Sequence, residues 1–140
     1  MSLNLLAVQD QITEKLRELP QDVYETTPSD DTKLRFDANG TILPYIVVTY
    51  SDMYESIDSA GIVSTRLDTK VSYVDVFCCA PTERAARQVA ELVRDKLLGF
   101  SPVDGGEIRI EGGAKYPSVN SKTGMFISEL NFSLPVNTVW

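Results

Sequence analysis

The sequence contains no histidine, and its two cysteines, Cys78 and Cys79, are neighbours within an apolar run. Histidine is the side chain whose charge ordinarily changes near neutral pH, and it is the commonest metal ligand in proteins. Its absence excludes Ser-His-Asp and Cys-His catalysis and disfavours most zinc sites. A protein that acts through its shape and its contacts is therefore favoured.

The two cysteines are interpreted as packing residues. Adjacent residues of a strand point to opposite faces, so a disulfide between Cys78 and Cys79 would be strained and a shared metal site is disfavoured. A free cysteine also behaves as a small buried hydrophobe. We accordingly expect no metal and no cofactor.

Long hydrophobic runs and an excess of positive charge are also missing. No run approaches the roughly 18 apolar residues of a membrane span, and the charged residues among the first 19 do not fit a secretory signal. The net charge of −7 disfavours DNA as a ligand, because affinity for phosphate comes mainly from lysine and arginine. We expect no membrane contact and a cytoplasmic, reducing environment.

What is present fits one globular domain spanning residues 1–140, with 43% apolar and 24% charged residues. Its first element is a helix of about four turns, since five apolar residues recur at steps of three and four before Pro20 ends the pattern. They are Leu5, Val8, Ile12, Leu16 and Leu19. Residues 21–37 read as an extended polar connection. Its acidic residues are interpreted as a solvated linker, with an electrostatic docking surface as the alternative.

Two strands and a second helix follow. Residues 41–51 predict a strand in which Pro44 lies at an edge or at the beginning, because proline cannot donate to a ladder. Residues 52–65 read as a loop or hairpin tip. Residues 66–80 predict the longest strand, central and covered on both faces. Thr82 is the expected cap of a helix that runs to Leu98, with Gly99 in a left-handed conformation after it.

The last third of the chain predicts a short strand over residues 107–111, a long loop over 112–124 and a final strand from Phe126 with one core face and one mostly polar face. The order of elements is helix, strand, strand, helix, strand, strand. It predicts an α+β fold in which two helices pack on one face of a mostly antiparallel sheet of four to five strands.

Signals for chemistry are weak. Ser121-Lys122-Thr123-Gly124 is similar to the end of a phosphate loop, but it lacks the glycine before the lysine and a helical pattern after it. A carboxylate pair or a magnesium site needs no histidine, and Asp75, in the middle of the longest strand, is the acid that most merits scrutiny. We expect it to pair with an arginine across the sheet or to be exposed in an oligomer, and we expect no catalytic residue.

Exposed apolar groups in loops and at the chain end are typical of protein interfaces. Two loops, a proline-marked strand and the C-terminus supply the candidates. Trp140 either folds back onto its own domain or contacts another subunit, and the sequence leaves both alternatives open. The candidate interface residues are Pro44, Tyr54, Ile57, Ile62, Val63, Lys115, Tyr116, Val119, Lys122, Val139 and Trp140.

The layout of the chain resembles that of the tail-terminator, or minor tail, proteins of long-tailed bacteriophages. An amphipathic helix leads through a polar stretch to the strand Leu43-Pro44-Tyr45-Ile46-Val47-Val48. The layout continues with a long loop, the strand 71–79 and the helix 82–98. It ends with a short strand, a tyrosine-containing loop and the alternating final strand. The resemblance covers nearly the whole chain.

This resemblance implies a homohexameric ring that caps the growing tail tube, stops its polymerisation and offers a docking surface to the head or neck. The implied partners are other copies of the chain, the tail tube protein and a head or neck completion protein. DNA would pass through the ring without being specifically bound. The implied location is the virion tail, after assembly in the host cytoplasm, and the family has no catalytic residues to transfer.

A ring made from one kind of subunit needs two different complementary patches on each copy. The sequence suggests the strand that begins near Pro44 as one patch and the final strand with Val139 and Trp140 as the other, so that neighbouring sheets meet around the ring. Two alternatives remain: another head-tail connector or completion protein, and a small histidine-free enzyme with a carboxylate site.

Overall fold

The computed structural model describes residues 5–26, 34–55, 67–103, 106–113, 116–120 and 124–139, with the backbone alone for 52–55, 67–70 and 136–139. These residues form two helices and six strands. In chain order they are α1 (Leu5–Leu16), β1 (Asp22–Tyr24), β2 (Tyr45–Glu55), β3 (Leu67–Ala80), α2 (Glu83–Leu97), β4 (Arg109–Gly113), β5 (Ser118–Val119) and β6 (Phe126–Val139).

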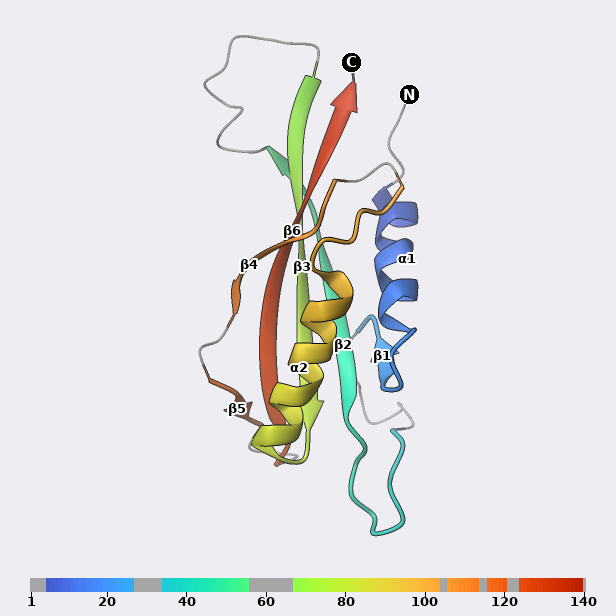
Figure 1. Ribbon diagram of the computed structural model, residues 1–140, viewed down its shortest axis with the longest axis vertical. Helices are drawn as coiled ribbons and strands as arrows, with labels where there is room; N and C mark the ends of the chain where they lie inside the picture. The colour runs from blue at the N-terminus through green and yellow to red at the C-terminus, as the bar shows by residue number, and fades with distance from the viewer. Residues whose placement is uncertain are drawn as a thin grey trace.

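The strands form one sheet in the order β1-β2-β3-β6-β4, and β5 pairs with β6 off this path (Figure 1). Every pairing is antiparallel except that of β1 with β2. The long central strands β3 and β6 pair without interruption, from Leu67 opposite Val139 to Ala80 opposite Phe126. The expected α+β fold and mostly antiparallel sheet are confirmed, but the sheet has six strands rather than four to five.

The two extra strands arise where the sequence predicted connections. β1 lies within 21–37 and pairs in parallel with the first three residues of β2. β5 is a two-residue strand within the predicted loop 112–124. Strands of two or three residues are too short to show the alternation that marks a strand in a sequence.

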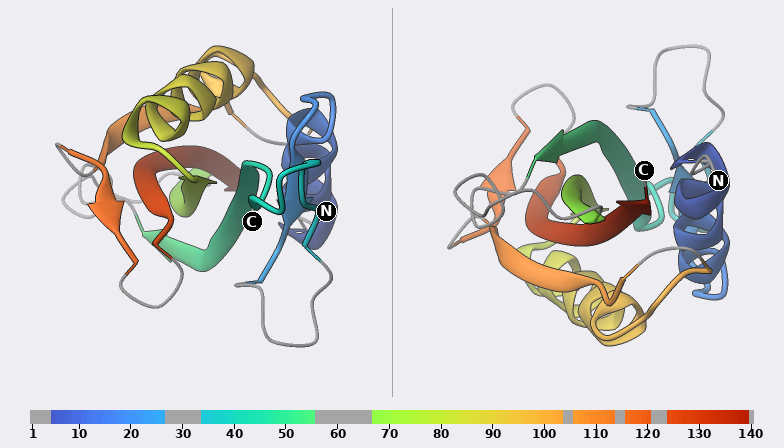
Figure 2. Two further views of the ribbon diagram at one scale, coloured as in Figure 1. Left: turned by 90° about the horizontal axis from the view of Figure 1, so that it is seen from below. Right: turned by 90° about the horizontal axis from the view of Figure 1, so that it is seen from above.

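Both helices pack on one face of the sheet, as predicted, and Figure 2 shows them outside the coiled sheet, next to β2 and β6. The core between these layers takes side chains from α1, α2 and the three long strands. Its fully enclosed members include Ile12, Leu16, Ile46, Val48, Val74, Val76, Cys78, Val93, Leu97 and Phe132. Burial of this apolar surface is the main favourable contribution to folding.

The helix α2 forms as its sequence predicts. The side chain of Thr82 accepts a hydrogen bond from the amide of Ala85, which satisfies one of the free N–H groups of the first turn. Beyond the helix, Gly99 has φ of +84°, the left-handed conformation that glycine adopts without a steric penalty. The apolar stripe predicted for α2 is buried, and it consists of Ala86, Val89, Ala90, Val93 and Leu97.

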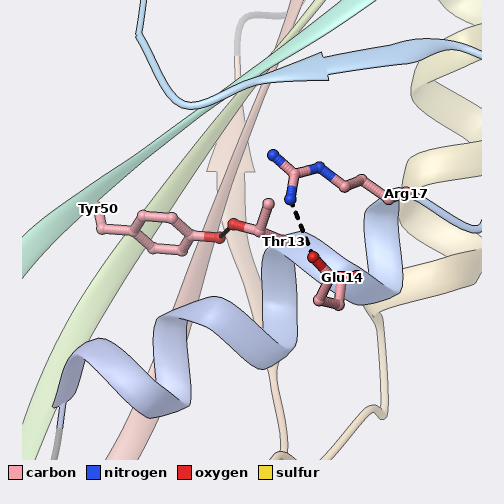
Figure 3. Close-up of polar contacts among 4 residues, drawn as sticks. All are labelled: Thr13, Glu14, Arg17 and Tyr50. Atoms are coloured by element: carbon pink, nitrogen blue, oxygen red, sulfur yellow. Dashed lines mark hydrogen bonds and ion pairs between the residues drawn. The ribbon is translucent and has the colours of Figure 1, made fainter.

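The helix α1 ends at Leu16, about one turn before the predicted end, although Leu19 still packs against the core. Two polar contacts tie it to β2. The hydroxyls of Thr13 and Tyr50 are 2.6 Å apart (Figure 3), and Gln9 donates to the carbonyl of Ser51 over 3.3 Å. The helix is therefore fixed to the sheet by hydrogen bonds as well as by apolar packing.

Predicted boundaries are corrected at two strands. β2 begins at Tyr45, directly after Pro44, and continues through residues 52–55, where the sequence predicted a loop. β4 occupies 109–113 rather than 107–111, so the glycine pair predicted as a turn lies in the strand. A side chain at Gly113 would collide with the Glu129 carbonyl, which explains why glycine suits this close approach to β6.

The prediction that β3 is central is confirmed, but the prediction that both faces are covered is wrong within the described chain. On the helix face, Val74, Val76 and Cys78 are fully enclosed. On the opposite face Tyr73 is 43% exposed and Phe77 is half-buried. No described helix lies on that face, which we call the open face.

Candidate functional site

The carboxylate of Asp75 lies on the open face and pairs with an asparagine rather than with the predicted arginine. Asn131, directly opposite on β6, donates from Nδ2 to Asp75 Oδ1 over 2.6 Å, and Glu129 Oε1 lies 3.5 Å from the same nitrogen. The amide donates a hydrogen bond to the carboxylate without adding a positive charge, and the register of β3 and β6 places it there. Among the residues that the structure describes, no three His, Cys, Asp or Glu side chains gather as metal ligands.

The two cysteines pack as the sequence predicted. Both are free and buried, with Cys78 in the core and Cys79 on the open face beside Tyr45. Burial raises the pKa of the Cys78 thiol to about 12, and it raises that of Cys79 to about 11. Both thiols therefore stay protonated and unreactive at neutral pH.

Aromatic side chains cross the open face from β1 to β3. Tyr24 and Tyr45 meet edge to face, with ring centroids 5.8 Å apart, and Tyr45 is opposite Cys79 in the register. Burial is the main cause that raises the pKa of Tyr45 to about 12. With Tyr73 and Phe77 on the adjacent strand, these rings form a partly exposed aromatic strip.

A groove of about 610 Å³ lies on the helix side of the sheet, between α2 and the β4 edge. Its apolar part contains Ala90 from α2, Ile110 from β4 and Leu130 from β6. Charged side chains complete its walls. Its lining residues are Arg87, Ala90, Glu91, Arg94, Ile110, Glu111, Gly112, Gly113, Pro117, Ser128, Glu129 and Leu130, and Asp75 is not among them.

The predicted interface residues fall into three groups. Tyr116 and Val119 are 70% and 57% exposed, on the segment that follows β4. Pro44 is half-buried before β2, and Tyr54 and Val139 lie in β2 and β6, where only the backbone is described. The candidates outside the described residues are Ile57, Ile62, Val63, Lys115, Lys122 and Trp140.

The sheet order bears on the two patches predicted for a ring, which themselves stay predictions. β1 pairs with the first three residues of β2, so β2 is not an outer strand there. β4 pairs with β6 only between Leu130 and Ser133 and does not reach the end of β6 at Val139. Because pairing partners come from distant parts of the chain, this order was not readable from local sequence patterns.

Phe36 was not among the predicted interface residues, yet it is 58% exposed on a short hairpin over residues 34–43 that leads into β2. The hairpin projects past the beginning of β2 at the lower end of Figure 1. Its turn, Asp37-Ala38-Asn39-Gly40, was a recognisable signal. An apolar residue beside that turn could have marked an exposed contact.

In the described part of the chain neither helix is long and apolar enough to cross a bilayer. No protein-family model matches the chain, and no curated protein sequence matches it. Among solved structures, it is similar to a chain from the virion of a native gene transfer agent particle, at 18% sequence identity and a TM-score of 0.67. The match covers 96% of this chain and 97% of that chain, so the two share a fold over nearly their whole lengths.

Proposed function

We propose that this chain is a structural protein of a phage-like virion, and that it forms a hexameric ring which caps the tail tube and ends its polymerisation. The observation that carries the proposal is the near-complete match, in both directions, to a chain of a virion particle. The layout of the sequence, which resembles tail terminators, supports the finer role. The tail tube protein and a head or neck completion protein are its proposed partners.

The sheet supplies two different outer strands for a head-to-tail ring. β1 lies at one edge and β4 at the other, and a closed ring of identical subunits joins two unlike surfaces at every contact. The exposed apolar residues Ile110, Tyr116 and Val119 gather on the β4 side. Neighbouring subunits would therefore meet through the β1 side of one copy and the β4 side of the next.

The charge of the chain suits a ring around passing DNA. A net charge of −7 repels phosphate, so the duplex would slide through without being held. On the open face the carboxylates of Asp75 and Glu129 both accept from the amide of Asn131, and Asp75 does not line the groove. We therefore propose a structural role and no enzymatic one.

The proposal is tested by the mass of the purified protein in solution and by electron microscopy, alone and mixed with assembling tail tube protein. We expect rings with a central hole of roughly 20 Å or more, wide enough for duplex DNA, and tubes that stop growing once a ring is bound. A monomer at every concentration, with tubes that grow unchanged, would overturn the proposal. Rings that bind head or neck protein and never the tube would assign a connector role instead.

A further inference from the structure

The hairpin 34–43 is closed by hydrogen bonds and has an apolar side chain at its surface. Asp37 N donates to Thr41 O over 2.8 Å, and Leu43 N donates to Arg35 O over 2.9 Å. The carboxylate Oδ1 of Asp37 accepts from the amides of Asn39 and Thr41, which closes the turn. These bonds lie on both sides of Phe36, which is 58% exposed.

The base of the hairpin is tied to the β1 edge. Arg35 Nε lies 2.6 Å from Asp22 Oδ2, the first residue of β1. This ion pair is exposed and adds little stability, but its geometry fixes the direction in which the hairpin leaves the sheet. The position of Phe36 is thus linked to one edge of the sheet.

The hairpin also carries a free backbone edge. The bonds that join its two arms flank the pair Phe36–Ile42, so the N–H and C=O of Phe36 point away from the partner arm. Such outward groups are a template for pairing with another strand. Phe36 thus combines a large exposed ring with two backbone groups that pair with none of the described residues.

A matching surface lies at the opposite edge of the sheet. Among the described strands β4 pairs with β6 alone, and all five of its residues are exposed. The adjoining groove of about 610 Å³ has Ala90, Ile110 and Leu130 in its apolar part, and it is larger than one phenylalanine side chain. An extended segment could add to β4 and place an aromatic ring in this groove, as in other cases of strand addition.

The charges agree with such an occupant. Arg35 and Asp37 flank Phe36, so the hairpin carries one charge of each sign. The groove is lined on its helix wall by Arg87, Glu91 and Arg94, which also carry both signs of charge. A segment with one positive and one negative side chain has better electrostatic complementarity to this groove than a segment whose charges are all of one sign.

We infer that Phe36 on the hairpin of one copy occupies the groove between α2 and β4 of the next copy, with the hairpin edge paired to β4. The hairpin is next to β1 and the groove is next to β4, so the contact runs head to tail and repeats around an assembly. The inference rests on the proposed self-assembly, and it names the residues that join two subunits.

The contact is tested by cross-linking two single variants, Phe36→Cys and Ile110→Cys, under mild oxidation. The two native cysteines are buried, so the introduced thiols are the reactive ones. The mixture should form a covalent heterodimer, whereas each variant alone should not. A chain that carries both substitutions should form a ladder of covalent multimers.

A second measurement uses Phe36→Ser, which removes an exposed ring and leaves the core intact. We expect the dissociation constant of the assembly to rise by roughly 30-fold or more, as for a residue central to an interface. Val103→Ser is the matched control, since Val103 is 71% exposed and lies outside the hairpin and the groove. Its assembly should be unchanged.

The outcomes separate this inference from the proposed ring. Rings that form normally with Phe36→Ser and give no cross-link would overturn the contact and leave the ring. Cross-linked chains that remain open and never cap tubes would support the contact and overturn the ring. A monomer under all conditions would overturn both.

Discussion

The two faces of β3 differ in what they contact. On one face, Val74, Val76 and Cys78 are fully enclosed by the two helices and by neighbouring strands. On the other, Tyr73 is 43% exposed, and Asp75 and Phe77 are half-buried. Both faces carry apolar residues, so composition alone does not distinguish them.

The helix face supplies most of the core, whereas the open face combines the buried Val47 and Cys79 with the partly exposed Tyr73 and Phe77. The stabilisation from an apolar side chain grows with the area that it buries. Substitutions on the helix face should therefore reduce stability more than substitutions at the exposed positions of the open face.

The largest expected effect is on the helix face, at Phe132. Phe132→Ala removes a fully buried ring opposite Val74 and leaves a cavity, which should lower the free energy of unfolding by about 3–5 kcal/mol. Urea unfolding followed by far-ultraviolet circular dichroism measures it. A loss below about 1 kcal/mol would show that the helix face is loosely packed.

A smaller effect on the free energy of unfolding is expected at alkaline pH, where Cys79 ionises. The pKa of Cys79 is raised from 9.0 to about 11 in the folded chain, so the unfolded chain loses this proton first. The contribution to stability is complete below pH 9 and is lost between pH 9 and about 11, by up to about 1.4 kcal/mol per pH unit. Urea unfolding at successive pH values should show this decline.

Cys79→Ala provides the control for that titration. The variant lacks the thiol, so its stability should fall less steeply than that of the parent chain between pH 9 and 11. Cys78 and Tyr45, whose pKa values are also raised, remain in both chains. Identical slopes would mean that Cys79 ionises as easily in the folded chain as in the unfolded one.

The smallest effect is expected on the open face, at Tyr73. Tyr73→Thr keeps a residue that favours strands and removes a partly exposed ring, so the free energy of unfolding should change by about 1 kcal/mol or less. The same urea unfolding experiment measures it. A loss comparable to that of Phe132→Ala would show that the two faces are equally important to the fold.

Local patterns predicted the elements that are long and regular. The helix α2 has a cap at Thr82, a repeated apolar stripe and Gly99 at its end, and all three signals lie within its own sequence. β3 and β6 were found for the same reason. The fold class follows from the order of such elements, and it was predicted correctly.

Features that depend on distant residues were missed. The extension of β2 into residues 52–55 depends on pairing with β3, and β1 depends on the start of β2. The exposure of Tyr116 and Val119 was expected because the sequence predicted a loop there, although Val119 lies in β5. Phe36 and Ile110 were missed because an apolar residue in a charged segment looks the same in the sequence whether it is buried, as Ile108 is, or exposed, as Ile110 is.

The position of β6 constrains how the chain folds during synthesis. This strand is made after the other described strands, yet it lies between β3 and β4 and forms the longest ladder of the sheet with β3. Until it emerges from the ribosome, one side of β3 stays unpaired, and an open apolar strand edge promotes aggregation. A nascent chain stalled before residue 126 therefore exposes an incompletely paired, aggregation-prone sheet. A chaperone would protect the chain best at that stage.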